Sequence, residues 1–145
     1  MSQRRRAREV ALQVLFEDDV NTRATSAEME SFLRGRLRNR GMEQFSLDLI
    51  LGTRRNLSAI DLRLGEVAAN WSLKRMAGVD RNVLRLAAYE ILFAGTPFRV
   101  AVNEAIELAK RFGSAQSGAF VNGILDRLKP EVEGQPAPGM KKAEA

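Results

Sequence analysis

The segment VAVNEAIELAKRFGSAQSGAFVNGILD, residues Val100–Asp126, contains two helix-forming patterns joined by a Gly-Ser pair. In each pattern apolar residues return every three or four positions, which is the spacing of one buried helix face. The first inner face carries Val102, Ala105, Ile106, Ala109 and Phe112. Gly113 is expected to end this helix and Ser114 to cap the next one. The second inner face carries Val121, Ile124, Leu125 and Leu128.

The same periodicity occurs upstream and predicts helices along most of the chain. Arg4–Phe16 repeats apolar residues on one face, and a second strong pattern follows Asp80, which is expected to cap its helix. Between them, Thr25 or Ser26 is expected to cap a helix that ends just before Gly41.

The stretch from Met42 to Asn70 is also compatible with a helix, and a kink or break is expected near Gly52–Asn56. No segment shows the alternation of a β-strand. The sequence therefore predicts an all-α bundle of about six or seven helices that forms a single domain over residues 1–129. Residues 130–145 contain three of the four prolines and no apolar periodicity, so a disordered tail is expected there.

Composition limits the chemistry that this chain can perform. Its 145 residues are 45% apolar, enough to form a core without cross-links. The chain contains no cysteine and no histidine. These absences exclude a disulfide, a thiolate zinc site and a cysteine nucleophile, and they remove the commonest metal ligand and general base. There is also no glycine-rich phosphate loop, so we expect no enzymatic activity, no metal and no cofactor.

The charge balance suggests a polyanionic partner. Lysine and arginine number 23 against 18 acidic residues, which gives a net charge of +5 and a pI of about 10.2. Arginine dominates the basic side, and its planar group suits bidentate phosphate contact. No apolar run has the length of a membrane span, and the N-terminus lacks the apolar core of a signal peptide. A cytoplasmic protein is therefore expected.

Four arginines lie in the first turns of the N-terminal helix: Arg4, Arg5, Arg6 and Arg8. Cations are unfavourable there because the helix N-terminus carries a partial positive charge. A bound phosphate would compensate both charges, whereas the alternative is a frayed, solvated helix start. The second arginine run, RGRLRNR at residues 34–40, is instead interpreted as a solvated helix C-terminus, where cations complement the dipole.

Two aromatic residues lie at the edges of their helix faces. Phe16 and Phe120 would each be able to stack on a nucleic-acid base, or to pack beneath a neighbouring helix. If the two helices are adjacent, these residues and the arginines would form a platform for a short single-stranded RNA.

Three segments together resemble the NusB family of bacterial transcription antitermination factors. They are RRRAREVALQVLF (residues 4–16), VDRNVLRLAAYEI (79–91) and the segment quoted first, in which FVNG (120–123) is the most specific motif. The resemblance runs in order from Arg4 to about Leu128. It implies two packed three-helix sub-bundles. It also implies binding to boxA, a short single-stranded RNA of ribosomal RNA leaders, together with the small-subunit ribosomal protein NusE, and assembly of an antitermination complex on RNA polymerase.

The resemblance also implies roles for individual residues. It assigns RNA backbone contact to Arg4, Arg5, Arg6 and Arg8, places Phe16 near the RNA, and assigns base stacking to Phe120. It places the docking surface for NusE at the start of a later helix, at Asp80 and Arg81. This chain departs from the family in having Ala119 before the second phenylalanine, Ala115 and Gln116 after the helix junction, and phenylalanine rather than an aromatic hydroxyl at position 16.

Two other functions fit parts of the sequence. The NusB-like fold also forms the N-terminal domain of ribosomal-RNA cytosine methyltransferases, but the lack of cysteine and the end of the chain at Ala145 count against that enzyme. A protein-interaction scaffold, or a homodimer that occludes the arginine face, stays open as the alternative.

Overall fold

The computed structural model describes residues 2–129, and the tail predicted to be disordered lies outside the described residues. The described part contains seven α-helices and no strand, which confirms the all-α prediction. The helices are α1 (Gln3–Val20), α2 (Ser26–Arg36), α3 (Arg40–Arg55), α4 (Leu57–Val67), α5 (Gly78–Tyr89), α6 (Phe98–Phe112) and α7 (Ser117–Asp126). Two short elements flank α5: the 3₁₀ turn η1 (Leu73–Arg75) and the π-helical turn η2 (Glu90–Ala94).

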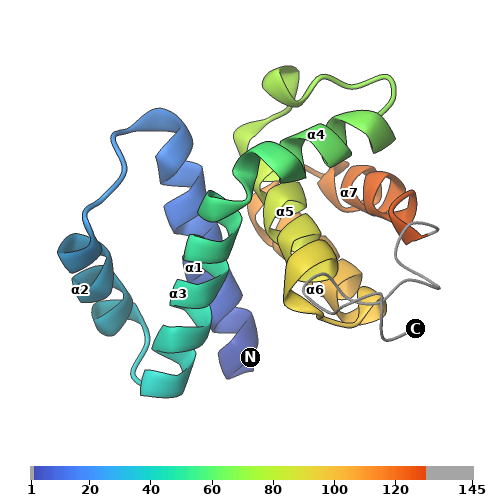
Figure 1. Cartoon of the computed structure of the whole chain (residues 1–145). Coiled ribbons are helices and arrows are strands. Elements are labelled where there is room, and N and C mark those ends of the chain that lie inside the picture. Colours follow the sequence, from blue (N-terminus) through green and yellow to red (C-terminus); the bar gives the residue numbers. More distant parts are fainter. Residues whose placement is uncertain (1, 130–145) are drawn as a thin grey trace, which may run out of the picture.

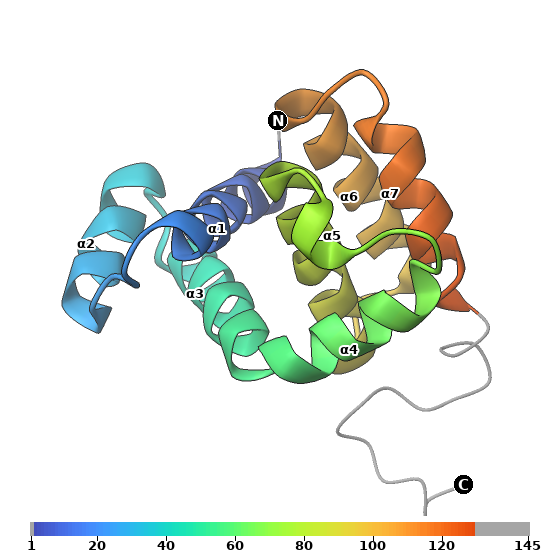
Figure 2. The same ribbon diagram turned by 90° about the horizontal axis from the view of Figure 1, so that it is seen from above.

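The helices form two groups that meet at α5. Helices α1, α2 and α3 make one group, and α4, α6 and α7 surround α5 in the other (Figure 1). Seen from above, α5 lies between the first group and the α6–α7 pair (Figure 2). Its inner residues Val83, Leu84 and Ala88 are completely buried. The core is therefore continuous across the two sub-bundles, with α5 as the shared helix.

The α3–α4 junction shows how closely the two groups approach. The predicted break is confirmed, because α3 ends at Arg55 and Asn56 separates it from α4. The Asn56 amide donates a hydrogen bond to the Gly52 carbonyl (2.8 Å). A Cβ atom at Gly52 would overlap the ring of Tyr89, the last residue of α5. Glycine is required here because the ring lies directly on the α3 backbone.

Local capping explains where α2 and α3 begin. Thr25 caps α2 as predicted, since its hydroxyl accepts from the Glu28 N–H (3.2 Å) and the Glu28 carboxylate accepts from the Thr25 N–H (2.8 Å). The expectation that Gly41 follows the end of α2 was wrong. Asn39 accepts a hydrogen bond from the Met42 N–H (3.1 Å), so a new helix starts at Arg40 and includes Gly41.

Two other predictions about helix caps were wrong, and so was one about burial. Asp80 is not the cap of α5, because that helix already begins at Gly78 and Asp80 lies in its first turn. Ser114 does not cap α7, which begins at Ser117; its hydroxyl accepts from the Gln116 N–H (3.3 Å) in the preceding turn. Phe112 was expected in the core, but it is 44% exposed at the last residue of α6.

Candidate nucleic-acid interface

Arg8 forms an ion pair inside the protein. Its Nε and Nη2 donate to Oε2 and Oε1 of Glu90 (2.9 and 2.8 Å), and the two side chains are 6% and 2% exposed. The Thr96 hydroxyl donates a further hydrogen bond to Glu90 (3.0 Å). Burial alone would lower the pKa of Arg8, but the hydrogen bonds and charge of Glu90 outweigh burial and raise it. The pair therefore joins α1 to η2 as a charged but satisfied contact.

Arg5 pairs with a different helix. Its Nε and Nη2 donate to the Glu104 carboxylate on α6 (3.1 and 2.9 Å), and the Arg5 side chain keeps 37% of its surface exposed. These hydrogen bonds lower the pKa of Glu104, and they outweigh the opposing effect of burial. Arg5 thus holds the start of α1 against α6 and still reaches the surface.

Carboxylates of other helices or turns therefore pair with Arg5 and Arg8, and a third N-terminal arginine, Arg6, pairs with Glu9 within α1 (3.3 Å). This placement contradicts the expectation that Arg8 contacts an RNA backbone directly, because its guanidinium lies in the interior. Arg4 and Arg6 are exposed, and the Arg4 guanidinium lies 4.7 Å from the centre of the Phe45 ring. The cations that remain available to a ligand are Arg4, Arg6 and the exposed part of Arg5.

A groove of about 400 Å³ lies between α1, the start of α5 and the end of α6. We call it the α1–α6 groove. It is lined by Arg6, Glu9, Leu12, Gln13, Phe16, Val79, Arg111 and Phe112. The two phenylalanines and the aliphatic side chains give it an apolar surface, and the two arginines add positive charge. This combination suits a nucleic-acid base in the groove with its phosphate at the arginines.

Glu9 positions the two arginines of the groove. Its side chain is only 3% exposed, and its carboxylate lies 3.3 Å from both Arg6 and Arg111. The arginine side chains remain 45% and 53% exposed. One buried negative charge thus fixes two partly exposed positive charges, and the three groups together keep a net charge of +1.

Phe16 both packs and lines the groove. Its ring covers Gly78, where an added Cβ would lie 2.8 Å from the Phe16 Cε1 atom. The same residue forms part of the groove surface beside Phe112. Sequence periodicity suggested the role of Phe16 but missed Phe112 and Arg111, because it assigned the end of α6 to the core.

Phe120 lies elsewhere. Its ring meets Trp71 edge to face with 5.2 Å between ring centres, and Trp71 is 57% exposed. Helices α5 and α6 lie between α1 and α7, so Phe16 and Phe120 are not on adjacent helices (Figure 2). Phe120 therefore does not line the groove with Phe16; Phe112 is the aromatic residue that does.

The start of α5, expected to dock a protein, is tied to the rest of the molecule through Arg81. The Arg81 guanidinium makes two hydrogen bonds to Asp19 (3.0 and 2.9 Å) and two to the carbonyls of Leu73 and Met76 (3.1 and 3.0 Å). Arg81 therefore fixes the end of α1 and the turn η1 against α5. Asp80 differs, because its buried Oδ1 atom has no hydrogen-bond partner among residues 2–129.

Neither a metal site nor a membrane span is found in the part of the chain that the structure describes. The Asp and Glu residues there form no group of three or more able to hold a metal ion. None of its helices is both long and apolar enough to cross a membrane.

Comparison with known proteins agrees with the geometry. The sequence model of the NusB family matches residues 5–130. The transcription antitermination protein NusB of Desulfosudis oleivorans is 43% identical over 142 residues, which cover 94% of this chain and 92% of the relative. The corresponding protein of Desulfitobacterium hafniense is 46% identical over 134 residues, 89% of either chain.

Solved structures give the same result for the fold. The structure of T. maritima NusB is 41% identical and superposes with a TM-score of 0.78, covering 88% of this chain and 91% of that one. A crystal structure of antitermination factors NusB and NusE in complex with dsRNA has a similar fold, with 23% identity, a TM-score of 0.80 and coverage of 90% and 98%. Because its sequence matches the family over nearly the whole described length and its helices superpose on those of a NusB structure, the chain belongs to the NusB family.

Proposed function

We propose that this chain is a transcription antitermination factor that binds boxA-like single-stranded RNA of ribosomal RNA leaders together with NusE. In this role it helps to assemble an antitermination complex on RNA polymerase and catalyses no reaction. Its relatives at 43% and 46% identity carry the name of transcription antitermination proteins. One solved structure of the same fold is described as NusB and NusE in complex with double-stranded RNA, which supports NusE and RNA as classes of partner.

The α1–α6 groove is the observation that carries this proposal. A base enters it and stacks on the exposed ring of Phe112, with Phe16 beside it. Stacking on an aromatic side chain contributes about 1–3 kcal/mol per base with little dependence on sequence. Arg6 and Arg111 bind the flanking phosphates, and Arg4 and Arg5 extend the positive surface along the start of α1.

The other expected residues take different parts in this proposal. Arg8 supports the interface from inside by fixing α1. Phe120 offers a separate aromatic contact beside Trp71, outside the groove. NusE docks at the start of α5, where Asp80 and Arg81 lie, and the hydrogen bonds of Arg81 to Asp19 hold that start in place.

Replacement of Phe112 tests the groove. Fluorescence anisotropy with a labelled boxA-like strand is expected to show binding about 5- to 150-fold weaker for Phe112→Ala, the equivalent of 1–3 kcal/mol of lost stacking. Leu62→Ala is the matched control, because Leu62 is also an exposed apolar residue, 65% exposed on α4 and outside the groove. Equal affinities of the two variants would contradict a stacking role for Phe112.

Light scattering on the same samples tests the alternative. A homodimer that occludes the arginine face would dissociate as RNA is added, and its affinity for RNA would fall with rising protein concentration. A mass that stays monomeric with and without RNA leaves the groove accessible, as the proposal requires.

A further inference from the structure

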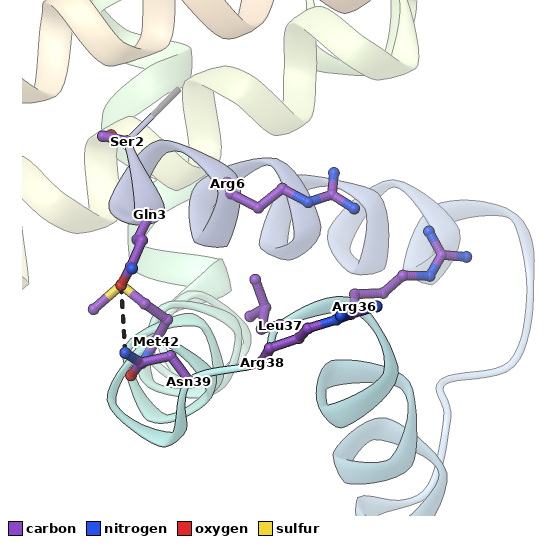
Figure 3. Close-up of a pocket in the computed structure, with 8 residues that line it drawn as sticks. All are labelled: Ser2, Gln3, Arg6, Arg36, Leu37, Arg38, Asn39 and Met42. Atoms are coloured by element: carbon purple, nitrogen blue, oxygen red, sulfur yellow. Dashed lines mark hydrogen bonds between the residues drawn. The ribbon is translucent and has the colours of Figure 1, made fainter.

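A second, basic cleft lies on the other side of Arg6 from the α1–α6 groove. It has a volume of about 440 Å³ and is formed by the start of α1 and the linker between α2 and α3. The lining residues are Ser2, Gln3, Arg6, Arg36, Leu37, Arg38, Asn39 and Met42 (Figure 3). A hydrogen bond from the Asn39 side-chain amide to the Gln3 side-chain oxygen Oε1 (3.4 Å) connects the two walls. We call it the α1–linker cleft.

Three arginines and no carboxylate line this cleft. Arg6 comes from α1, whereas Arg36 and Arg38 come from the end of α2 and the linker, and all three side chains extend toward the same side (Figure 3). The Arg36 guanidinium lies 4.7 Å from the centre of the Phe32 ring, which restrains it without neutralising it. Arg38 is exposed and forms no ion pair with any residue between 2 and 129. Arg36 and Arg38 therefore give the cleft positive charge that no carboxylate of the described residues compensates, whereas Arg6 is paired with Glu9.

Arg6 belongs to both hollows. It lines the α1–linker cleft together with Arg36 and Arg38, and it lines the α1–α6 groove together with Phe112. The basic surface is thus continuous across α1. A strand whose base stacks in the groove brings its backbone past Arg6 and on toward the linker.

We propose that the α1–linker cleft binds the phosphate backbone of the RNA strand beyond the base held in the α1–α6 groove. This inference rests on the proposed function. An extended polyanion fits better than a single small anion, because the three guanidinium groups come from two walls of an open cleft and share Arg6 with the neighbouring site. The cleft supplies no exposed aromatic ring, so the contact is to backbone and independent of base sequence.

This assignment changes the interpretation of the arginine run at residues 34–40. Arg36 and Arg38 line the cleft, whereas Arg34 and Arg40 do not. Arg34 and Arg40 are exposed and form no ion pair with other described residues. The two arginines outside the cleft therefore serve as a control for the two that line it.

The test compares two double variants of equal net charge, Arg36→Gln/Arg38→Gln and Arg34→Gln/Arg40→Gln. Anisotropy is measured over a range of salt concentrations with a boxA-like strand and with the same strand extended at both ends by eight uridines. Uridine stacks weakly, so the extension adds mainly phosphates. Thermal melting confirms that both variants fold.

The cleft variant is expected to bind the short strand with the affinity of the wild type. Extending the strand is not expected to increase its affinity. On the extended strand, the loss of two phosphate contacts lowers the slope of log affinity against log salt by about 1.4. Over one decade of salt concentration, down to about 0.1 M, this difference makes binding roughly 25-fold weaker than that of the wild type. The control variant is expected to keep nearly all of the wild-type gain. Equal losses in both variants, or no gain from extension in the wild type, would overturn the cleft assignment while the groove proposal stands. Failure of the wild type to bind even the short strand would overturn both.

Discussion

The buried Arg8–Glu90 pair leads to a prediction about stability. Glu90→Gln removes the nearer of the two carboxylates that compensate Arg8 and leaves the enclosed guanidinium with Glu104 alone, at 3.9 Å. Because the side chains of Arg8 and Glu90 are 6% and 2% exposed, water does not reach the guanidinium to replace the two lost hydrogen bonds without local rearrangement. Breaking one side of such a pair destabilises a protein by about 3–5 kcal/mol. With a urea m-value of about 2 kcal/mol/M, the unfolding midpoint falls by roughly 1.5–2.5 M.

The double variant Arg8→Met/Glu90→Leu is expected to be more stable than Glu90→Gln. It leaves no buried charge, and apolar side chains of similar volume replace the ion pair. The Thr96 hydroxyl loses its acceptor, but Thr96 is only partly buried and can turn to water. Urea denaturation followed by circular dichroism measures both variants against the wild type. A Glu90→Gln variant as stable as the wild type would refute the buried pair.

The same double variant separates a structural role of Arg8 from a phosphate contact. Its net charge equals that of the wild type, so general attraction of RNA is unchanged. If Arg8 only positions α1, the salt dependence of RNA binding keeps the wild-type slope. A direct phosphate contact would appear as a slope lower by about 0.7. That result would show that Arg8 contacts RNA directly and would contradict its assignment to the interior.

Two further predictions concern stability alone. Gly52→Ala is expected to destabilise the protein by about 1–3 kcal/mol in urea denaturation, because the methyl group overlaps the Tyr89 ring; Gly65→Ala, with no neighbour within 4 Å, is expected to be neutral or stabilising, and equal effects would contradict the close contact. Arg5 holds the pKa of Glu104 below its usual range, so ionised Glu104 stabilises the fold above the unfolded pKa and loses that effect as the pH falls through the folded pKa. Between about pH 6 and about pH 3, the wild type should therefore lose more stability than Glu104→Gln, and parallel pH profiles would exclude this contribution.

Helix positions were predictable because the information is local. A helix that buries one face must repeat apolar residues every three or four positions, and that pattern is visible in a short window. The capping box at Thr25 spans only four residues, and the break at Asn56 follows from a nearby glycine. Between α2 and α3 two local signals conflict: Gly41 favours the end of a helix, and Asn39 favours the start of one. The Asn39 cap determines the boundary, because α3 begins at Arg40.

The interface was less predictable because its geometry depends on distant partners. The carboxylates that neutralise Arg8 and Arg5 lie 82 and 99 residues away in the sequence. Helical periodicity indicates which face of α6 is apolar, but not how far the neighbouring helices extend along it. Phe112 therefore has the spacing of a core residue and the position of a groove residue.

The start of α5 connects the two proposed partners. Gly78 lies beneath the Phe16 ring, and Val79 lines the α1–α6 groove, so this turn is one wall of the groove. Asp80 follows directly, and Arg81 ties the same turn to the end of α1 through Asp19. A protein that docks at Asp80 would therefore lie against the edge of the groove that we propose to hold RNA. We expect the two ligands to affect each other's affinity through this rigid turn, and equilibrium linkage requires the effect to be equal in both directions.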